Sequence, residues 1–157
     1  MIKIIAVGKI KEKYLKDGIN EYIKRLAPYT KMEIIELPDE NTFEDKPALN
    51  QQVKQIEGQR ILNKIGKDDF VIALDLHGDN FSSEKLAKKL AEIYTYHTSK
   101  ITFVIAGSLG YDPQVIARAN LRWKLSDCTF PHQLVRLLLV EQIYRCYKIN
   151  NHEPYHK

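Results

Sequence analysis

The chain of 157 residues has the length of one domain, and we expect residues 1–157 to form a single one. Its composition, 44% hydrophobic and 28% charged, excludes disordered and collagen-like chains, and no apolar run approaches the roughly 20 residues that span a bilayer. The net charge is +4, with eight basic and three acidic residues in 1–32, nine and fourteen in 33–116, and seven and three in 117–157. Basic ends that meet in space would suit an anionic partner such as nucleic acid, although solvated helix faces give the same pattern.

The sequence shows neither the cysteine spacing of a redox-active pair nor the features of an export signal. Cys128 and Cys146 form no CxxC pair, and the apolar stretch at residues 2–7 is too short for a signal peptide. We therefore expect a cytoplasmic protein with reduced cysteines and no membrane anchor.

Strand and helix patterns alternate along the chain. In order, they predict a strand (2–7), a helix (11–26), a strand (32–37), a polar loop (38–46), a helix (47–65), a strand (70–76), a turn (77–80), a helix (82–98), a strand (101–105), a glycine loop (106–111), a short helix opened by Asp112 and Pro113, a strand (121–125) and a long helix (131–149). The continuous apolar run at 101–105 is typical of a parallel strand covered on both faces. The sequence thus predicts an α/β fold with a mainly parallel sheet.

The last helix carries apolar side chains in all directions. A helix of this kind is buried on more than one side, and a domain this small cannot easily enclose one of such length. We expect one of its faces to meet a second subunit in a homodimer. The alternative is a helix held between layers of one compact domain.

Ligands of open α/β sheets bind beyond the carboxyl ends of the strands. The clearest such end is the loop with Gly107 and Gly110, which would let the backbone approach a ligand closely. It matches neither GxGxxG nor GxxxxGK[ST], so neither a dinucleotide nor a nucleoside triphosphate is indicated.

The letters His152-Glu153-Pro154-Tyr155-His156 fit the HExxH motif of zinc metalloproteases. Zinc binding needs both histidines one turn apart on a helix, and Pro154 would disrupt that helix. We expect no metal site.

A richer combination of groups begins the last helix, where the stretch TFPHQLVR supplies His132 and Arg136, and Glu141 and Arg145 follow. His132 lies in the first turn, close to the strand-end loops, although a capping or packing histidine would sit there too. The arginines and Glu141 can equally be salt-bridged helix residues. The residue chemistry alone specifies no reaction.

The run TFPHQLVRLLLVEQIYRCYKI, followed by EPYHK, resembles the C-terminus of the ribosomal large subunit methyltransferase H family, small members of the SPOUT class of α/β-knot methyltransferases. The resemblance covers essentially the whole chain. It also rests on Ile4-Ile5-Ala6-Val7-Gly8-Lys9, Glu21-Tyr22, Lys24-Arg25-Leu26, Glu57-Gly58 and Ala106-Gly107-Ser108.

The resemblance implies a fold and a function. The fold is a parallel sheet with helices on both faces and a C-terminal trefoil knot, which is a rare exception to unknotted connections. The implied activity is S-adenosylmethionine-dependent methylation of the N3 nitrogen of a pseudouridine in 23S ribosomal RNA, on assembled ribosomes, by a homodimer. The alternative is a non-catalytic ribosome-binding protein that keeps the fold.

The resemblance also implies site residues. The cofactor would be bound by Leu74, Ala106, Gly107, Leu125, Ser126, Asp127, Cys128, Thr129 and Phe130. Ala106 departs from the glycine pair usual in the family, and its methyl group would narrow the approach to the cofactor.

The remaining assignments concern the last helix and the tail. His132 is a candidate general base, since imidazole titrates near neutral pH. Tyr155 and His156 are assigned as catalytic residues that would cover the target base or assist proton removal. RNA contacts are assigned to Arg136, Arg145 and Lys157, with structural carboxylates as the alternative partners of the two arginines.

Overall fold

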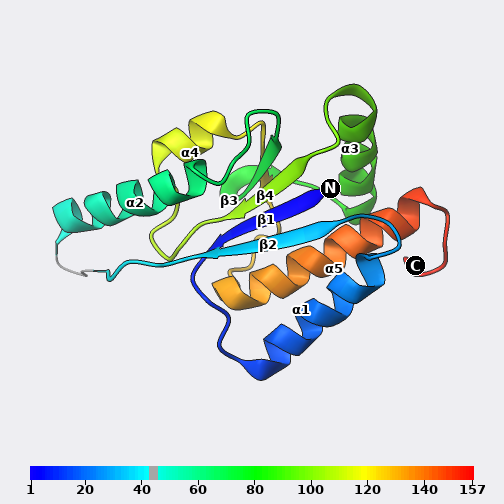
Figure 1. Cartoon of the computed structure of the whole chain (residues 1–157), viewed down its shortest axis with the longest axis horizontal. Coiled ribbons are helices and arrows are strands. Elements are labelled where there is room, and N and C mark those ends of the chain that lie inside the picture. The colour runs from blue at the N-terminus through cyan, green and yellow to red at the C-terminus, as the bar shows by residue number, and fades with distance from the viewer. Residues whose placement is uncertain (43–45) are drawn as a thin grey trace.

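A computed structural model describes residues 1–42 and 46–157 (Figure 1). The elements are β1 (Ile2–Val7), α1 (Lys13–Leu26), β2 (Met32–Leu37), α2 (Pro47–Leu62), β3 (Phe70–Asn80), α3 (Ser83–Tyr96), β4 (Ile101–Ile105), α4 (Pro113–Arg118), β5 (Leu121–Lys124) and α5 (His132–Asn150). The predicted order of strands and helices is confirmed. The predicted loop at 38–46 falls partly outside the described residues.

The five strands form one sheet in the order β2-β1-β4-β3-β5, and every pairing is parallel. The predicted α/β class with helices on both faces is therefore confirmed, whereas the trefoil knot stays a prediction. No helix in the described part of the chain is long and apolar enough to cross a membrane.

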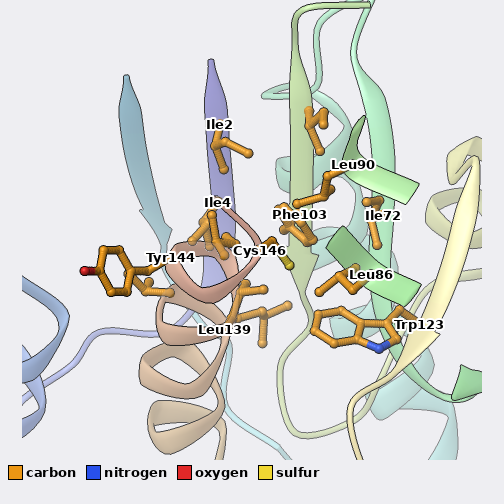
Figure 2. Close-up of a cluster of buried hydrophobic side chains, with 14 of the residues drawn as sticks. Ile2, Ile4, Ile72, Leu86, Leu90, Phe103, Trp123, Leu139, Tyr144 and Cys146 are labelled. Carbon is orange, nitrogen blue, oxygen red and sulfur yellow. The ribbon is translucent and has the colours of Figure 1, made fainter. Parts of the chain in front are cut away.

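Two apolar layers enclose the sheet. Side chains of β1, β3, β4 and β5 that face α1, α3 and α5 form the larger core. Figure 2 shows part of it, with Phe103, Trp123 and Leu139 among the labelled side chains. The opposite face packs under α2 and α4 in a smaller cluster around Ile5, Val71 and Val115. The all-round apolar α5 lies on the sheet between α1 and α3 (Figure 1).

The strand β3 is longer than predicted. The sequence predicts a turn at residues 77–80, yet β3 resumes after a register shift and pairs Asp79 with Trp123 and Asn80 with Lys124. A Cβ at Gly78 would lie 2.6 Å from the backbone of Arg122, so this glycine permits a close approach of two strands rather than a turn.

Candidate active site

A pocket of about 760 Å³ opens at the carboxyl edge of the sheet, where parallel α/β folds bind ligands. Its walls come from the ends of β3 and β4, from the segment after β5 and from the first turn of α5. Volumes of this size hold small organic ligands and cofactors.

Most of the predicted cofactor residues meet in this pocket. The wall includes Leu74, Ala106, Gly107, Leu125, Ser126, Cys128, Thr129 and Phe130. Asp127 does not line it, because its side chain is 86% exposed and forms an ion pair with Lys124. The contacts of these residues with a cofactor remain a proposal.

The loop after β4 owes its shape to its glycines. Gly110 adopts a φ of +85°, which an L side chain rarely tolerates, and its N–H donates to the carbonyl of Gly107 at 3.0 Å. At Gly107, however, an added Cβ would lie 2.8 Å from Oε1 of Glu57 and 3.2 Å from Val7. The missing side chain therefore makes room for the protein's own interior, a reason that differs from the predicted close approach to a ligand.

Tyr111 closes this loop onto the sheet. Its hydroxyl lies 2.7 Å from the carbonyl oxygen of Leu74 and 2.7 Å from that of Val104, and it can donate its single proton to one of them at a time. Burial, and then the negative charge of Asp75, raises the pKa of Tyr111. The hydroxyl thus stays neutral and spans the ends of β3 and β4, a role that nothing in the sequence indicates.

An ion pair in the pocket wall also escapes sequence reasoning. Nε and Nη2 of Arg122 lie 2.7 and 2.6 Å from Oδ2 of Asp75, whose side chain is 8% exposed. Both residues line the pocket. The position of Asp75 just after the apolar part of β3 was the available signal, since polar groups at strand ends point to a ligand edge.

His132 is the only predicted catalytic residue that lines this pocket in the described chain. It occupies the first turn of α5, behind Pro131 at the N-cap, and its side chain is exposed. No hydrogen bond holds its imidazole within the described residues, so the ring remains available to a ligand.

Arg136, one turn further along α5, faces away from solvent. It is 2% exposed; Nη1 donates to Oε2 of Glu36 at 2.5 Å and Nη2 to the carbonyl of Gly8 at 3.1 Å. The same carboxylate oxygen accepts from the N–H of Ile10 at 2.9 Å. Two kinds of partner were expected for Arg136, RNA and a structural carboxylate, and the structure shows the carboxylate. Through these contacts Arg136 ties α5 to the carboxyl ends of β1 and β2.

The other expected catalytic residues lie at the opposite end of α5. Glu153, in the tail, accepts from the hydroxyl of Tyr29 at 2.7 Å and from Nζ of Lys148 at 2.8 Å, and Tyr29 precedes β2. The tail thus lies at the amino edge of the sheet, on the side of the N-terminus (Figure 1). Arg145, which contacts the tail, lies 13 residues beyond His132, or about 20 Å along the helix axis.

Charged and aromatic groups hold Tyr155 and His156 in place. The hydroxyl of Tyr155 donates to Oε1 of Glu141 at 3.0 Å, and the same oxygen lies 2.5 Å from Nη2 of Arg145. Arginine only donates, so Nδ1 of His156 accepts from Arg145 at 3.0 Å and its Nε2 faces Oε1 of Glu84 at 2.7 Å. Burial raises the pKa of Tyr155 above its ordinary value.

The predicted site residues of α5 and the tail therefore lie in two separate places. Tyr155, His156 and Arg145 form one cluster with Glu141 and Glu84, which we call the tail cluster, and none of its members lines the pocket. Lys157 is exposed beside it. The tail is packed rather than frayed.

The HExxH letters do not form a metal site. The helix α5 ends at Asn150, before the motif, and His152 has a φ of 54°. Among the described residues, no group of three or more His, Cys, Asp or Glu side chains could hold a metal ion.

The sequence of this chain matches a known protein family. The family described as "Predicted SPOUT methyltransferase" matches residues 1–156. Proteins named "Ribosomal RNA large subunit methyltransferase H" from Carboxydothermus hydrogenoformans and from Exiguobacterium sibiricum are 54% and 55% identical over 157 residues, covering 99% of this chain and 99% of each relative. The protein of that name from Acetivibrio thermocellus is 52% identical over the same coverage.

Proposed function

This chain belongs to the SPOUT methyltransferase family, and we propose that it methylates the N3 nitrogen of a pseudouridine in 23S ribosomal RNA. In this proposal it is a cytoplasmic, single-domain enzyme of residues 1–157 that uses S-adenosylmethionine and acts on assembled ribosomes as a homodimer. The observation that carries the proposal is the pocket, where eight of the nine cofactor residues implied by the family gather around His132.

The chemistry of the pocket wall suits the cofactor. Leu74, Leu125 and Phe130 supply apolar surface, and the loops at 106–107 and 125–130 supply backbone donors and acceptors for an adenine ring. Ala106 is only 8% exposed, so its methyl group takes little of the pocket surface. When bound, S-adenosylmethionine supplies an activated methyl group, and the protein has chiefly to align donor and acceptor.

The acceptor nitrogen must lose a proton. In our proposal His132 accepts it, because its imidazole is exposed at the pocket and is not held by another side chain among the described residues. Histidine is the side chain most often used to accept a proton from a reacting group, and it has to lie within hydrogen-bond reach of that proton.

The separation of the tail cluster from the pocket supports a dimer. If Tyr155, His156 and Lys157 serve the reaction, each tail has to reach the pocket of the other subunit, because its own pocket lies about 20 Å away along α5. In a two-fold dimer both sites are completed in the same way. Leu134, Leu137 and Leu138 on α5 are only half-buried in one chain, which leaves apolar surface for the contact.

Purified protein with labelled S-adenosylmethionine tests this proposal on two substrates from a strain that lacks this protein: assembled ribosomes and free 23S ribosomal RNA. Ribosomes incubated without the purified protein are the control. We expect label on ribosomes and little on free RNA. Calorimetric binding of the cofactor without transfer to any substrate would favour the alternative, a ribosome-binding protein. Loss of activity with a zinc-selective chelator, at a magnesium concentration that keeps ribosomes assembled, would contradict the expectation that the protein has no zinc site.

A further inference from the structure

The Glu57–Gly58 pair lies on α2 directly behind the glycine loop of the pocket. A Cβ at Gly107 would lie 2.8 Å from Oε1 of Glu57, and a Cβ at Gly58 would lie 2.7 Å from the Cβ of Asp112. Asp112 is the N-cap of α4, and its Oδ1 accepts from the N–H of Gln114 at 3.1 Å. The pair therefore contacts both ends of the loop that runs from Gly107 to Asp112.

Glu57 is a buried carboxylate with an unusual set of neighbours. It is 5% exposed, and Oε2 accepts from the backbone N–H of Glu40 at 2.9 Å, while Oε1 faces Gly107. Among the described residues no cation forms an ion pair with it. Burial raises the pKa of Glu57, so the environment disfavours its charge.

A second buried carboxylate shows the usual arrangement. Asp69 is 7% exposed, forms an ion pair with Lys3 at 3.0 Å, and accepts from Gly66 and Thr102. Its partners account for its burial by holding β3, β4 and β1 together at the amino edge. Glu57 has no such set of partners, although a buried carboxyl group is costly. What distinguishes it is the contact with the pocket loop.

We propose that the Glu57–Gly58 pair is a positioning element of the cofactor pocket, in which the Glu57 carboxyl group and the bare backbone at Gly58 fix the loop from Gly107 to Asp112. This inference rests on the proposed function. Neither residue lines the pocket, so both act through the loop. By accepting from Glu40, the same carboxyl group ties the segment after β2 to this support.

A double-mutant cycle on Glu57→Ala and Gly107→Ala tests the contact, with the dissociation constant of S-adenosylmethionine measured by calorimetry. In the parent background, Gly107→Ala forces its new methyl group against Oε1, and we expect the constant to rise about 30-fold. With Glu57→Ala the contact with Oε1 is gone and Val7, at 3.2 Å, remains, so the same change should raise the constant about 3-fold, a coupling of about tenfold. Any direct effect of the methyl group on the cofactor is the same in both backgrounds and cancels.

Asp69→Asn is the matched control. It removes the charge of another buried carboxylate, and it should lower the melting temperature while leaving the dissociation constant within about twofold, without coupling to Gly107→Ala. Additive effects of Glu57→Ala and Gly107→Ala would overturn the inference and leave Glu57 a core residue only.

Hydrogen exchange gives a readout that needs no cofactor. In the conservative Glu57→Gln variant and in Glu57→Ala, amides of residues 107–112 should exchange faster relative to those of β3, and more so with alanine. Unchanged exchange in both variants would overturn the inference, and if Glu57→Ala does not fold, unchanged exchange in Glu57→Gln alone would overturn it. A parent protein that fails to bind S-adenosylmethionine would instead refute the proposed function, and the exchange data would still decide whether the pair holds the loop.

Discussion

The two ends of α5 are built in opposite ways. At its first turn, the pocket is lined by backbone, apolar side chains, the ion pair of Asp75 with Arg122 and the unengaged imidazole of His132. At its last turns, the tail cluster interlocks Glu141, Arg145, Tyr155 and His156 through short polar contacts. The first arrangement can receive a ligand as it stands, whereas the second has to exchange partners before it can act on one.

This difference bears on how the two histidines are used. His132 faces a pocket, while both nitrogens of His156 already have partners in Arg145 and Glu84. An imidazole with both nitrogens engaged cannot take a proton from a substrate without releasing one of them. We therefore assign the proton acceptor to His132 and the covering of the target base to the tail.

The largest expected effect comes from a buried charge on α5, because it would disrupt the pocket and the tail cluster together. Leu139 is 0% exposed, and Leu139→Glu buries an unpaired carboxylate between α5 and the sheet, which should cost about 4 kcal/mol or more and unfold the chain. The matched variant Leu138→Glu alters a half-buried neighbour and should leave each chain folded.

Circular dichroism and light scattering separate these outcomes. We expect Leu138→Glu to give folded chains of 18.3 kDa, half the mass of the parent dimer. A parent that is itself monomeric at micromolar concentration would contradict the dimer. A folded Leu139→Glu variant would contradict the described packing of α5.

Gly107→Val should break the pocket and spare the tail cluster. Its Cβ alone would meet Oε1 of Glu57 at 2.8 Å and Val7 at 3.2 Å, so the loop must shift. We expect cofactor affinity to fall about 100-fold or more with the protein still folded, given that overpacking typically costs 1–3 kcal/mol. Calorimetry checks this, with Ser99→Val, at an exposed position outside the pocket, as the control, and unchanged affinity in folded Gly107→Val would refute this account of the loop.

Removing residues 153–157 should disrupt the tail cluster and spare the pocket. The tail does not line the pocket of its own chain, so cofactor affinity should stay within about threefold, while methylation of ribosomes falls steeply, by about 100-fold. Tyr29 and Lys148 lose their contact with Glu153, so a modest fall in melting temperature is expected as well. Methylation at the parent rate would show that Tyr155 and His156 take no part in the reaction.

The smallest expected effect is a loosening of the tail in acid. Contacts with His156 and Lys148 lower the pKa values of Glu84 and Glu153 below their ordinary value of 4.5. Because these values are lower in the folded state, the stabilisation is present above pH 4.5 and is lost as the pH falls through the folded values. As the pH falls below 4, protection against hydrogen exchange, measured relative to the intrinsic rate at each pH, should fall more at residues 151–157 than at residues 106–111. An equal fall in both segments would contradict this.

Much of the fold follows from the sequence, because each strand is a short apolar or β-branched run between turn residues. The extension of β3 could not be foreseen, since Gly78 has turn chemistry locally and only the neighbouring backbone of Arg122 makes it part of a strand. Pairing across strands that lie some 45 residues apart is a tertiary property.

The candidate site, too, could be predicted from the sequence only in part. The loops at strand ends and His132 were predictable, because topology brings carboxyl ends of parallel strands together. The contacts of Tyr111, Asp75 and Glu57 were not, since each depends on which distant group faces it across the pocket or behind the loop. The family resemblance named Tyr155 and His156, but only the structure shows how far they lie from the pocket of the same chain.

The most direct measurement of the central claim is mass spectrometry of 23S ribosomal RNA from a strain that lacks this protein. We expect that one pseudouridine loses its N3 methyl group, that the parent protein restores it, and that Gly107→Val does not. A methylation pattern identical to that of the parent strain would contradict the proposed reaction.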